Sequence, residues 1–303
     1  MIRKHNRRAA KAAFTIAFGV ALILGGAAAA PAAETQATPI IVGTKNFPEQ
    51  FLLGQLYMQA LEAKGFDVQY KENIGSTELI DTALRSGRIT MYPEYTGTML
   101  SVTFKRKTVP KTAAATYAAA KRAYEKRGQT LLRQTPFEDK DVLTVTRATA
   151  NRYGLKTIAS LSKVPNLTIT GFPEWDTRWR GPLDRLYGVE GFDFVPLAGI
   201  SAYGLLDRKR VEAADVFTTD PQLLSSKYTQ LRDPKNMFGF QHVAPVVERD
   251  LVAENGTKFT AALNAVSKLL TVKAMQAMNR AVVIAKKSPA KVADAFLKAN
   301  GLK

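Results

Sequence analysis

Aromatic and hydroxyl side chains gather at points where the sequence predicts the ends of strands. Residues 92–98 hold two tyrosines and two threonines, Tyr203 and Tyr228 follow later, and two tryptophans within residues 175–179 flank Arg178. Aromatic faces attract cations, and a quaternary ammonium suits a cage of such rings because it has no hydrogen-bond donor to satisfy. The planar guanidinium of Arg178 could hold a carboxylate of the same ligand. For any single tyrosine, ordinary packing is the competing interpretation.

The residues offer little support for catalysis. The chain has no cysteine, which excludes thiol nucleophiles, disulfides and thiolate metal sites. Beyond the N-terminal segment the only histidine is His242, which lies in an apolar run and is interpreted as structural. Nucleophile-elbow, dinucleotide-binding and phosphate-loop motifs do not occur. Carboxylates such as Glu94 and Asp220 could serve an enzyme, but no pair stands out, so we expect a protein that is not an enzyme and uses no cofactor or metal.

Residues 1–33 have the three parts of a secretory signal peptide. Five basic residues and no acidic ones precede an apolar run over residues 14–26, and small residues suited to cleavage follow over residues 27–33. A membrane anchor is the alternative, but the apolar run is short of the ~20 residues that a spanning helix needs. We therefore expect export, cleavage and a periplasmic location.

The charge is strongly basic but dispersed. The chain carries +17, and removal of the five basic residues of the signal peptide leaves +12. A nucleic-acid-binding protein concentrates its charge on one face or beside stacking aromatics, whereas the one dense cluster here lies within residues 105–111. We expect a solvated basic surface and no nucleic-acid partner.

Hydrophobic patterning predicts strands that alternate with helices. Helical spacing appears between the strands and again from residue 257 onward, where Ser288 precedes Pro289 as a helix start. This alternation is typical of parallel βαβ units and predicts an α/β protein. The expected strands cover residues 40–43, 66–74, 89–92, 142–145, 167–170 and 213–217.

Two segments share one layout. Residues 84–87 end a predicted helix that leads to a strand and the hydroxyl-rich loop 95–98, and residues 206–209 lead likewise to the loop 218–220. Ligands of open α/β sheets bind at the carboxyl ends of strands. Two such lobes facing each other would form one ligand cleft.

Five motifs, in order along the chain, resemble those of the glycine betaine/carnitine/choline-binding proteins of osmoprotectant ABC importers. Together they extend over nearly the whole chain after the signal peptide. The motifs are Val42–Phe47 with Glu49 and Gln50 following, Gly75–Glu78, Tyr92–Thr98, Phe217–Asp220 and Ala244–Val247.

The resemblance implies a type II periplasmic-binding-protein fold of two α/β lobes with a ligand cleft between them. Lobe one would comprise residues 34–142 and 246–303, and lobe two residues 143–245. It also implies a monomer that delivers a quaternary amine to the permease of an ABC transporter in the inner membrane. Alternatives are a binding protein for another cationic or zwitterionic solute such as an amino acid, a carboxylate-dependent periplasmic enzyme, or a sensor.

The resemblance also implies the ligand contacts. Tyrosines would surround the ammonium, Arg178 with Lys45 would hold any carboxylate, and Thr98 would donate a hydrogen bond. Where the family often has a tyrosine, this chain has Asp141, which could attract a cation or could be a solvated hinge residue. That departure widens the candidate ligands from glycine betaine to choline or a bulkier betaine such as a trimethylated histidine. The expected ligand-binding residues are Lys45, Tyr95, Thr98, Asp141, Arg178, Tyr203 and Tyr228.

Overall fold

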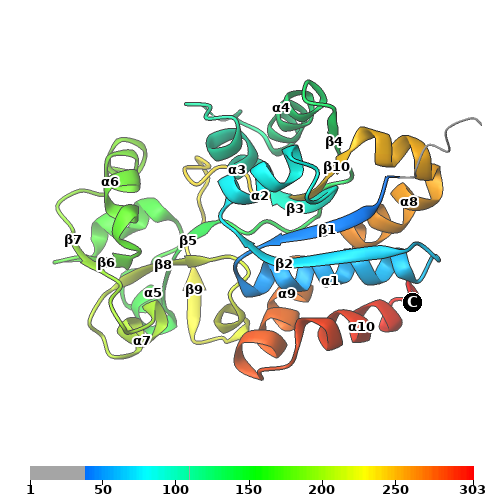
Figure 1. Cartoon of the computed structure of the whole chain (residues 1–303). Coiled ribbons are helices and arrows are strands. Elements are labelled where there is room, and N and C mark those ends of the chain that lie inside the picture. The colour runs from blue at the N-terminus through cyan, green and yellow to red at the C-terminus, as the bar shows by residue number, and fades with distance from the viewer. Residues whose placement is uncertain (1–37, 109) are drawn as a thin grey trace, which may run out of the picture. The chain divides into compact units, whose positions relative to one another are not determined.

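The computed structural model describes residues 38–108 and 110–303, so the predicted signal peptide lies outside the described residues. Two five-stranded sheets organise this part of the chain (Figure 1). The strand order of the first sheet is β2-β1-β3-β10-β4. Its strands are β1 (Ile40–Lys45), β2 (Val68–Gly75), β3 (Met91–Tyr95), β4 (Gln129–Leu131) and β10 (Val243–Glu248).

The second sheet repeats this arrangement in the order β7-β6-β8-β5-β9. In both sheets the first three strands are parallel and the fourth is antiparallel to its neighbours. The expected parallel βαβ units are therefore present, but each sheet is mixed. The strands of the second sheet are β5 (Asp141–Thr146), β6 (Thr168–Gly171), β7 (Asp193–Pro196), β8 (Ala213–Phe217) and β9 (Tyr228–Gln230).

Helices cover the first sheet, and their starts carry ordinary capping signals. α1 begins at Pro48, where the missing N–H costs nothing, and the Ser288 hydroxyl accepts a hydrogen bond from the Lys291 N–H at the start of α10. The helical elements beside this sheet are α1 (Pro48–Glu62), α2 (Thr77–Arg85), α3 (Thr96–Thr98), the π-helical turn η1 (Met99–Thr103), α4 (Ala113–Glu125), α8 (Arg249–Leu269), α9 (Val272–Asn279), the π-helical turn η4 (Arg280–Ile284) and α10 (Pro289–Ala299).

Side chains of the first sheet alternate between two apolar cores, because successive residues of a strand point to opposite faces. Ile40 and Val42 pack with α1, α8 and α10, whereas Ile41 packs with α2 and α4. β5 and β8 divide their side chains between two cores in the same way. The helical elements around the second sheet are α5 (Arg147–Tyr153), η2 (Ile158–Lys163), α6 (Pro173–Tyr187), α7 (Ala202–Asp207) and η3 (Pro221–Leu224).

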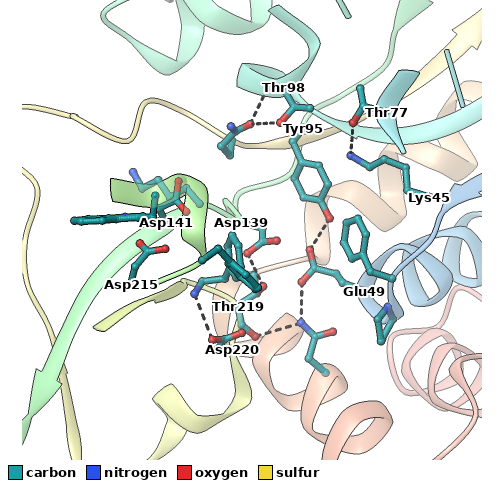
Figure 2. Close-up of a pocket in the computed structure, with 18 of the residues that line it drawn as sticks. Lys45, Glu49, Thr77, Tyr95, Thr98, Asp139, Asp141, Asp215, Thr219 and Asp220 are labelled. Carbon is teal, nitrogen blue, oxygen red and sulfur yellow. Dashed lines mark hydrogen bonds between the residues drawn. The ribbon is translucent and has the colours of Figure 1, made fainter. Parts of the chain in front are cut away.

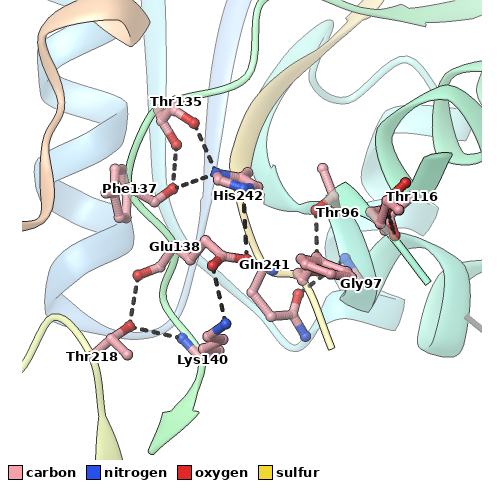
Figure 3. Close-up of polar contacts among 12 residues, drawn as sticks. Thr96, Gly97, Thr116, Thr135, Phe137, Glu138, Lys140, Thr218, Gln241 and His242 are labelled. Atoms are coloured by element: carbon pink, nitrogen blue, oxygen red, sulfur yellow. Dashed lines mark hydrogen bonds and ion pairs between the residues drawn. The ribbon is translucent and has the colours of Figure 1, made fainter. Parts of the chain in front are cut away.

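The chain passes from the first sheet to the second before β5 and returns before β10. The two connecting segments pair through an isolated antiparallel bridge between Glu138 and His242 (Figure 3). The His242 Nδ1 lies 2.9 Å from the carbonyl oxygen of Thr135, which agrees with a structural histidine. Within residues 38–108 and 110–303, no helix has the length and apolar character needed to cross a membrane.

Candidate functional site

A cavity of about 620 Å³ is lined by residues of both sheets and of the connecting segments. Lys45 and Tyr95 lie at the carboxyl ends of β1 and β3, and Phe217 lies at the carboxyl end of β8. The first residues of α1, α2 and α6 also line the cavity, as does Asn279 from the end of α9. The position agrees with the expectation that the ligand site lies where the strands end.

Tyr95 and Glu49 anchor one side of the cavity (Figure 2). The Tyr95 hydroxyl donates a hydrogen bond of 3.0 Å to Glu49 Oε1, and Asn279 Nδ2 donates one of 2.7 Å to Glu49 Oε2. Burial raises the pKa of the Glu49 carboxyl, although these donors favour its charged form. Phe47 stacks beside Tyr95 with ring centroids 6.2 Å apart.

The ammonium of Lys45 is already engaged. It lies 2.6 Å from Oε1 of the buried Glu94 and 3.4 Å from the Thr77 hydroxyl. The same ammonium lies 4.5 Å from the centroid of the Tyr95 ring, within cation–π range. Lys45 therefore holds Tyr95 in place, and its expected contact with a ligand carboxylate would compete with Glu94.

Thr98 is placed by a residue of the returning segment. The Gln241 Oε1 accepts hydrogen bonds from the backbone N–H groups of Gly97 and Thr98, at 3.1 and 3.0 Å, and from the Thr98 hydroxyl at 3.4 Å. Gly97 is required by sterics, because a Cβ there would lie 2.7 Å from the Phe240 carbonyl oxygen. The segment carrying the tyrosine and threonine is thereby tied to the strand that returns to the first sheet.

A second group of acids comes from the connecting segment and the loop after β8. Thr219 Oγ1 donates a hydrogen bond of 2.8 Å to Asp139, and the Tyr203 hydroxyl donates one of 3.0 Å to Asp220. Burial, followed by the charge of Glu49, raises the pKa of Asp139 well above its ordinary value. Burial also raises the pKa of Asp220. These carboxyls face a cavity with few cationic partners.

Asp141 and Asp215 form a further acidic pair on the second sheet (Figure 2). β5 and β8 pair so that Asp141 lies opposite Phe217, and Asp215, two residues earlier, lies on the same face. Burial is the largest effect on both carboxyls and raises the pKa of each. The negative charge of Asp141 raises the pKa of Asp215 further, whereas the positive charge of Arg178 lowers the pKa of Asp141. Asp215 Oδ1 has no hydrogen-bond partner in the described chain.

Apolar rings form the rest of the wall. The Trp175 ring stacks on Phe194 with centroids 5.7 Å apart, and the Arg178 guanidinium lies 4.6 Å from the centroid of the Trp179 ring. Phe172, which lines the cavity, is 49% exposed. The aromatic residues that line the cavity are Phe47, Tyr95, Phe172, Trp175, Trp179 and Phe217.

The structure brings five of the seven expected site residues to this cavity: Lys45, Tyr95, Thr98, Asp141 and Arg178. Tyr203 and Tyr228 are not part of its lining. The Tyr203 hydroxyl donates a hydrogen bond to Asp220, which does line the cavity. The Tyr228 hydroxyl donates a hydrogen bond to Asp207, and the Tyr228 ring packs against that of Tyr203 with centroids 4.9 Å apart. Tyr203 lines an adjoining cavity that shares Asp215, Phe217 and Asp220 with this one. The expected cage of three tyrosines stays a prediction, and the rings that line the cavity itself are one tyrosine, phenylalanines and tryptophans.

Sequence reasoning missed most of the acids. Asp215 lies within a strand whose neighbours are apolar, and Glu49 lies in the first helical turn, where acidic residues are common. Asp215 has no local pattern that indicates a ligand, whereas Glu49 follows the first of the five family-like motifs but was not assigned a ligand contact. Trp175 and Trp179 did carry a signal, because they flank Arg178 at helical spacing.

Comparison with known proteins identifies a family and a fold that match this chain. A family model described as the substrate binding domain of ABC-type glycine betaine transport systems matches residues 38–299. A glycine-betaine-binding protein of Pseudomonas aeruginosa is 30% identical over 281 residues, which cover 88% of this chain and 89% of that protein. The ergothioneine transport permease/ergothioneine binding protein EgtU of Helicobacter pylori is 29% identical over 276 residues, covering 87% of this chain and 48% of that protein.

A solved structure titled as a glycine betaine/carnitine/choline ABC transporter superposes with a TM-score of 0.80. It is 21% identical and covers 87% of this chain and 99% of its own. The likeness confirms the expected fold class, two α/β units of the periplasmic-binding-protein type.

Proposed function

Because the chain belongs to the family of substrate binding domains of ABC-type glycine betaine transport systems, we propose that it captures a quaternary ammonium compound and delivers it to the permease of an ABC importer. Candidate ligands are glycine betaine, choline and related betaines. The observation that carries this proposal is the composition of the cavity, where aromatic rings and carboxyls surround about 620 Å³. Such a lining attracts an alkylated cation through ring quadrupoles and through charge.

In this proposal each wall has its own role. Tyr95 presents its ring to the ammonium, Arg178 and Thr98 contact the remainder of the ligand, and Asp141 adds negative charge. Lys45 and Tyr203 act indirectly, by holding Tyr95 and Asp220.

The mechanism is binding. Both predicted lobes would contact the ligand, because Lys45 and Tyr95 of the first sheet and Asp215 and Phe217 of the second all line the cavity. A ligand that contacts both lobes favours the conformation in which both contacts are made, by its differential affinity for that conformation. Residues 1–33 would direct export to the periplasm.

The test is isothermal titration calorimetry of residues 34–303 with glycine betaine, choline, carnitine, proline betaine, a trimethylated histidine betaine and arginine. We expect saturable binding of at least one methylated ammonium compound and no binding of arginine, since the planar guanidinium lacks the methylated head that the rings would surround. Binding of arginine alone, or of none of these compounds, would refute the proposal.

A further inference from the structure

The charges of the cavity are unbalanced. Six carboxyl groups line it, whereas the lining has three basic side chains. Two of these bases already have acidic partners, Lys45 in Glu94 and Lys140 in Glu138, at 2.6 and 3.1 Å. Arg178 makes no ion pair within the described residues. The lining carboxyls are Glu49, Asp139, Asp141, Glu174, Asp215 and Asp220.

One of these acids has an unused oxygen. Asp215 lines the cavity and is only 4% exposed, and its buried Oδ1 makes no hydrogen bond of ordinary geometry with the described residues, although the indole of Trp175 lies beside this carboxyl. A buried acceptor left unpaired costs free energy, and a donor supplied by a ligand recovers that cost. In the described chain, no group of three or more histidine, cysteine or acidic side chains is arranged to hold a metal ion.

We propose, building on the proposed function, that Asp141 and Asp215 form a second subsite for a hydrogen-bond-donating group on the quaternary ammonium ligand. A hydroxyl satisfies this subsite, and an ammonium satisfies it better. The cavity therefore selects ligands with a net positive charge over zwitterionic betaines. Figure 2 shows this pair apart from Tyr95 and Glu49, which leaves the rings on that side for the methylated head.

Electrostatics gives the direction of the selection. A ligand carboxylate in this part of the cavity would lie near both acids, and Arg178 alone offsets one negative charge, while Glu174 on the same helix adds another. Unfavourable pairing of like charges discriminates between ligands as effectively as new attraction does.

Four ligands with the same methylated head test this subsite: tetramethylammonium, choline, (2-aminoethyl)trimethylammonium and glycine betaine. Calorimetry at neutral pH should give the tightest binding for the aminoethyl compound and weaker binding for choline. Tetramethylammonium should bind at least about tenfold more weakly than the aminoethyl compound, since hydrogen bonds between charged groups are the stronger class. Glycine betaine should bind no more tightly than tetramethylammonium.

The variant Asp215→Asn removes the charge and keeps the shape. It should lose about tenfold in affinity for the aminoethyl compound, and clearly less for tetramethylammonium, which meets only the longer-range change in charge. Asp141→Asn is the second variant and should act in the same direction. Asp193→Asn, on an exposed position of β7, is the matched control and should change neither affinity.

Proton exchange separates this assignment from its opposite, in which a protonated Asp215 donates a hydrogen bond to a ligand carboxylate. Because burial raises the pKa of Asp215, choline, which has no group of its own that titrates near neutral pH, should release protons on binding, measured as a dependence of the binding enthalpy on the buffer. Proton uptake with glycine betaine as the tightest ligand would overturn the inference and leave the proposed function intact. Equal losses for all ligands in Asp215→Asn would also overturn it. Absence of binding by the whole methylated set would refute the proposed function itself.

Discussion

At the scale of single residues, the carboxyls differ in how their burial is compensated. Glu49 receives two neutral donors, and Asp139 and Asp220 each receive a hydroxyl. Asp215 Oδ1 receives none in the described chain. Neutral donors satisfy an acid without cancelling its charge, so these carboxyls remain able to attract a cation.

Tyr95→Ala should weaken binding of a methylated ammonium by more than about 1 kcal/mol, the scale of a cation–π contact that is partly removed from water. Tyr95→Phe retains the ring and should lose much less. Titration calorimetry measures both. Tyr228→Ala is the control, because Tyr228 lies outside the cavity lining, and an equal loss in that variant would argue against a direct role for Tyr95.

Asp215→Asn should stabilise the ligand-free protein, increasingly so as the pH rises from about 4, the ordinary pKa of an aspartate. The raised pKa of Asp215 means that the folded state holds this proton more tightly than the unfolded state. Stability is therefore lost as the pH rises from the unfolded toward the folded pKa. Thermal unfolding from pH 4 to pH 8 checks this expectation. A variant that is less stable than the parent at neutral pH would contradict it.

At the scale of elements, the site depends on segments that meet from distant parts of the chain. The short helix α3 follows β3 directly and is held by Gln241, which precedes β10. The connecting segments contact each other again where the Gln241 N–H donates to Glu138 (Figure 3). A shift of one connecting segment therefore moves the threonine and tyrosine of the cavity.

Gly97→Ala should destabilise the protein by about 1–3 kcal/mol, the usual cost of an added methyl group in a packed site, because its Cβ would clash with the Phe240 carbonyl. It should also weaken ligand binding, since Thr98 and Tyr95 flank it. Ser288→Ala is the control: loss of its helix cap costs about 1 kcal/mol in stability and leaves affinity unchanged. Denaturant unfolding and calorimetry compare the two variants, and normal affinity in Gly97→Ala would contradict the expectation.

At the scale of the whole molecule, local and total charge have opposite signs. The chain is basic at +17, yet its cavity is lined by six acids and three bases. Low-dielectric walls concentrate the field of the charges that line a cavity. The cavity can therefore attract a cation although the protein as a whole repels one.

A ligand that contacts both sheets should stabilise both. At a free concentration 100 times its dissociation constant it should contribute about 2.7 kcal/mol, which corresponds to a rise of about 5–10 °C in the thermal midpoint for a domain of this size. Differential scanning fluorimetry measures the shift, and Tyr95→Ala at the same ligand concentration should show a smaller one. Two separate transitions, of which only one responds to ligand, would contradict stabilisation of both sheets.

Local sequence was sufficient for much of the fold. The β-branched run that begins at Ile40, the proline at the start of α1 and the serine that caps α10 each act through neighbours in the chain. Hydrophobic periodicity likewise placed β5, β6 and β8. Four strands were not predicted. The edge strands β4, β7 and β9 have only three or four residues and too little pattern to recognise, and β10 contains Pro245, which argues against a strand within a sheet.

The sequence by itself determined the α/β class, a ligand chemistry implied by tyrosine, tryptophan and arginine, and five residues that line the cavity. Only the tertiary structure decided which aromatics and acids share that cavity. It turned Tyr228 toward Asp207, and it brought Glu49, Asp139 and Asp215 together from three distant segments. The physical reason is that a strand or a helix turn sets the face of each side chain locally, whereas the neighbours on that face come from pairing between remote strands.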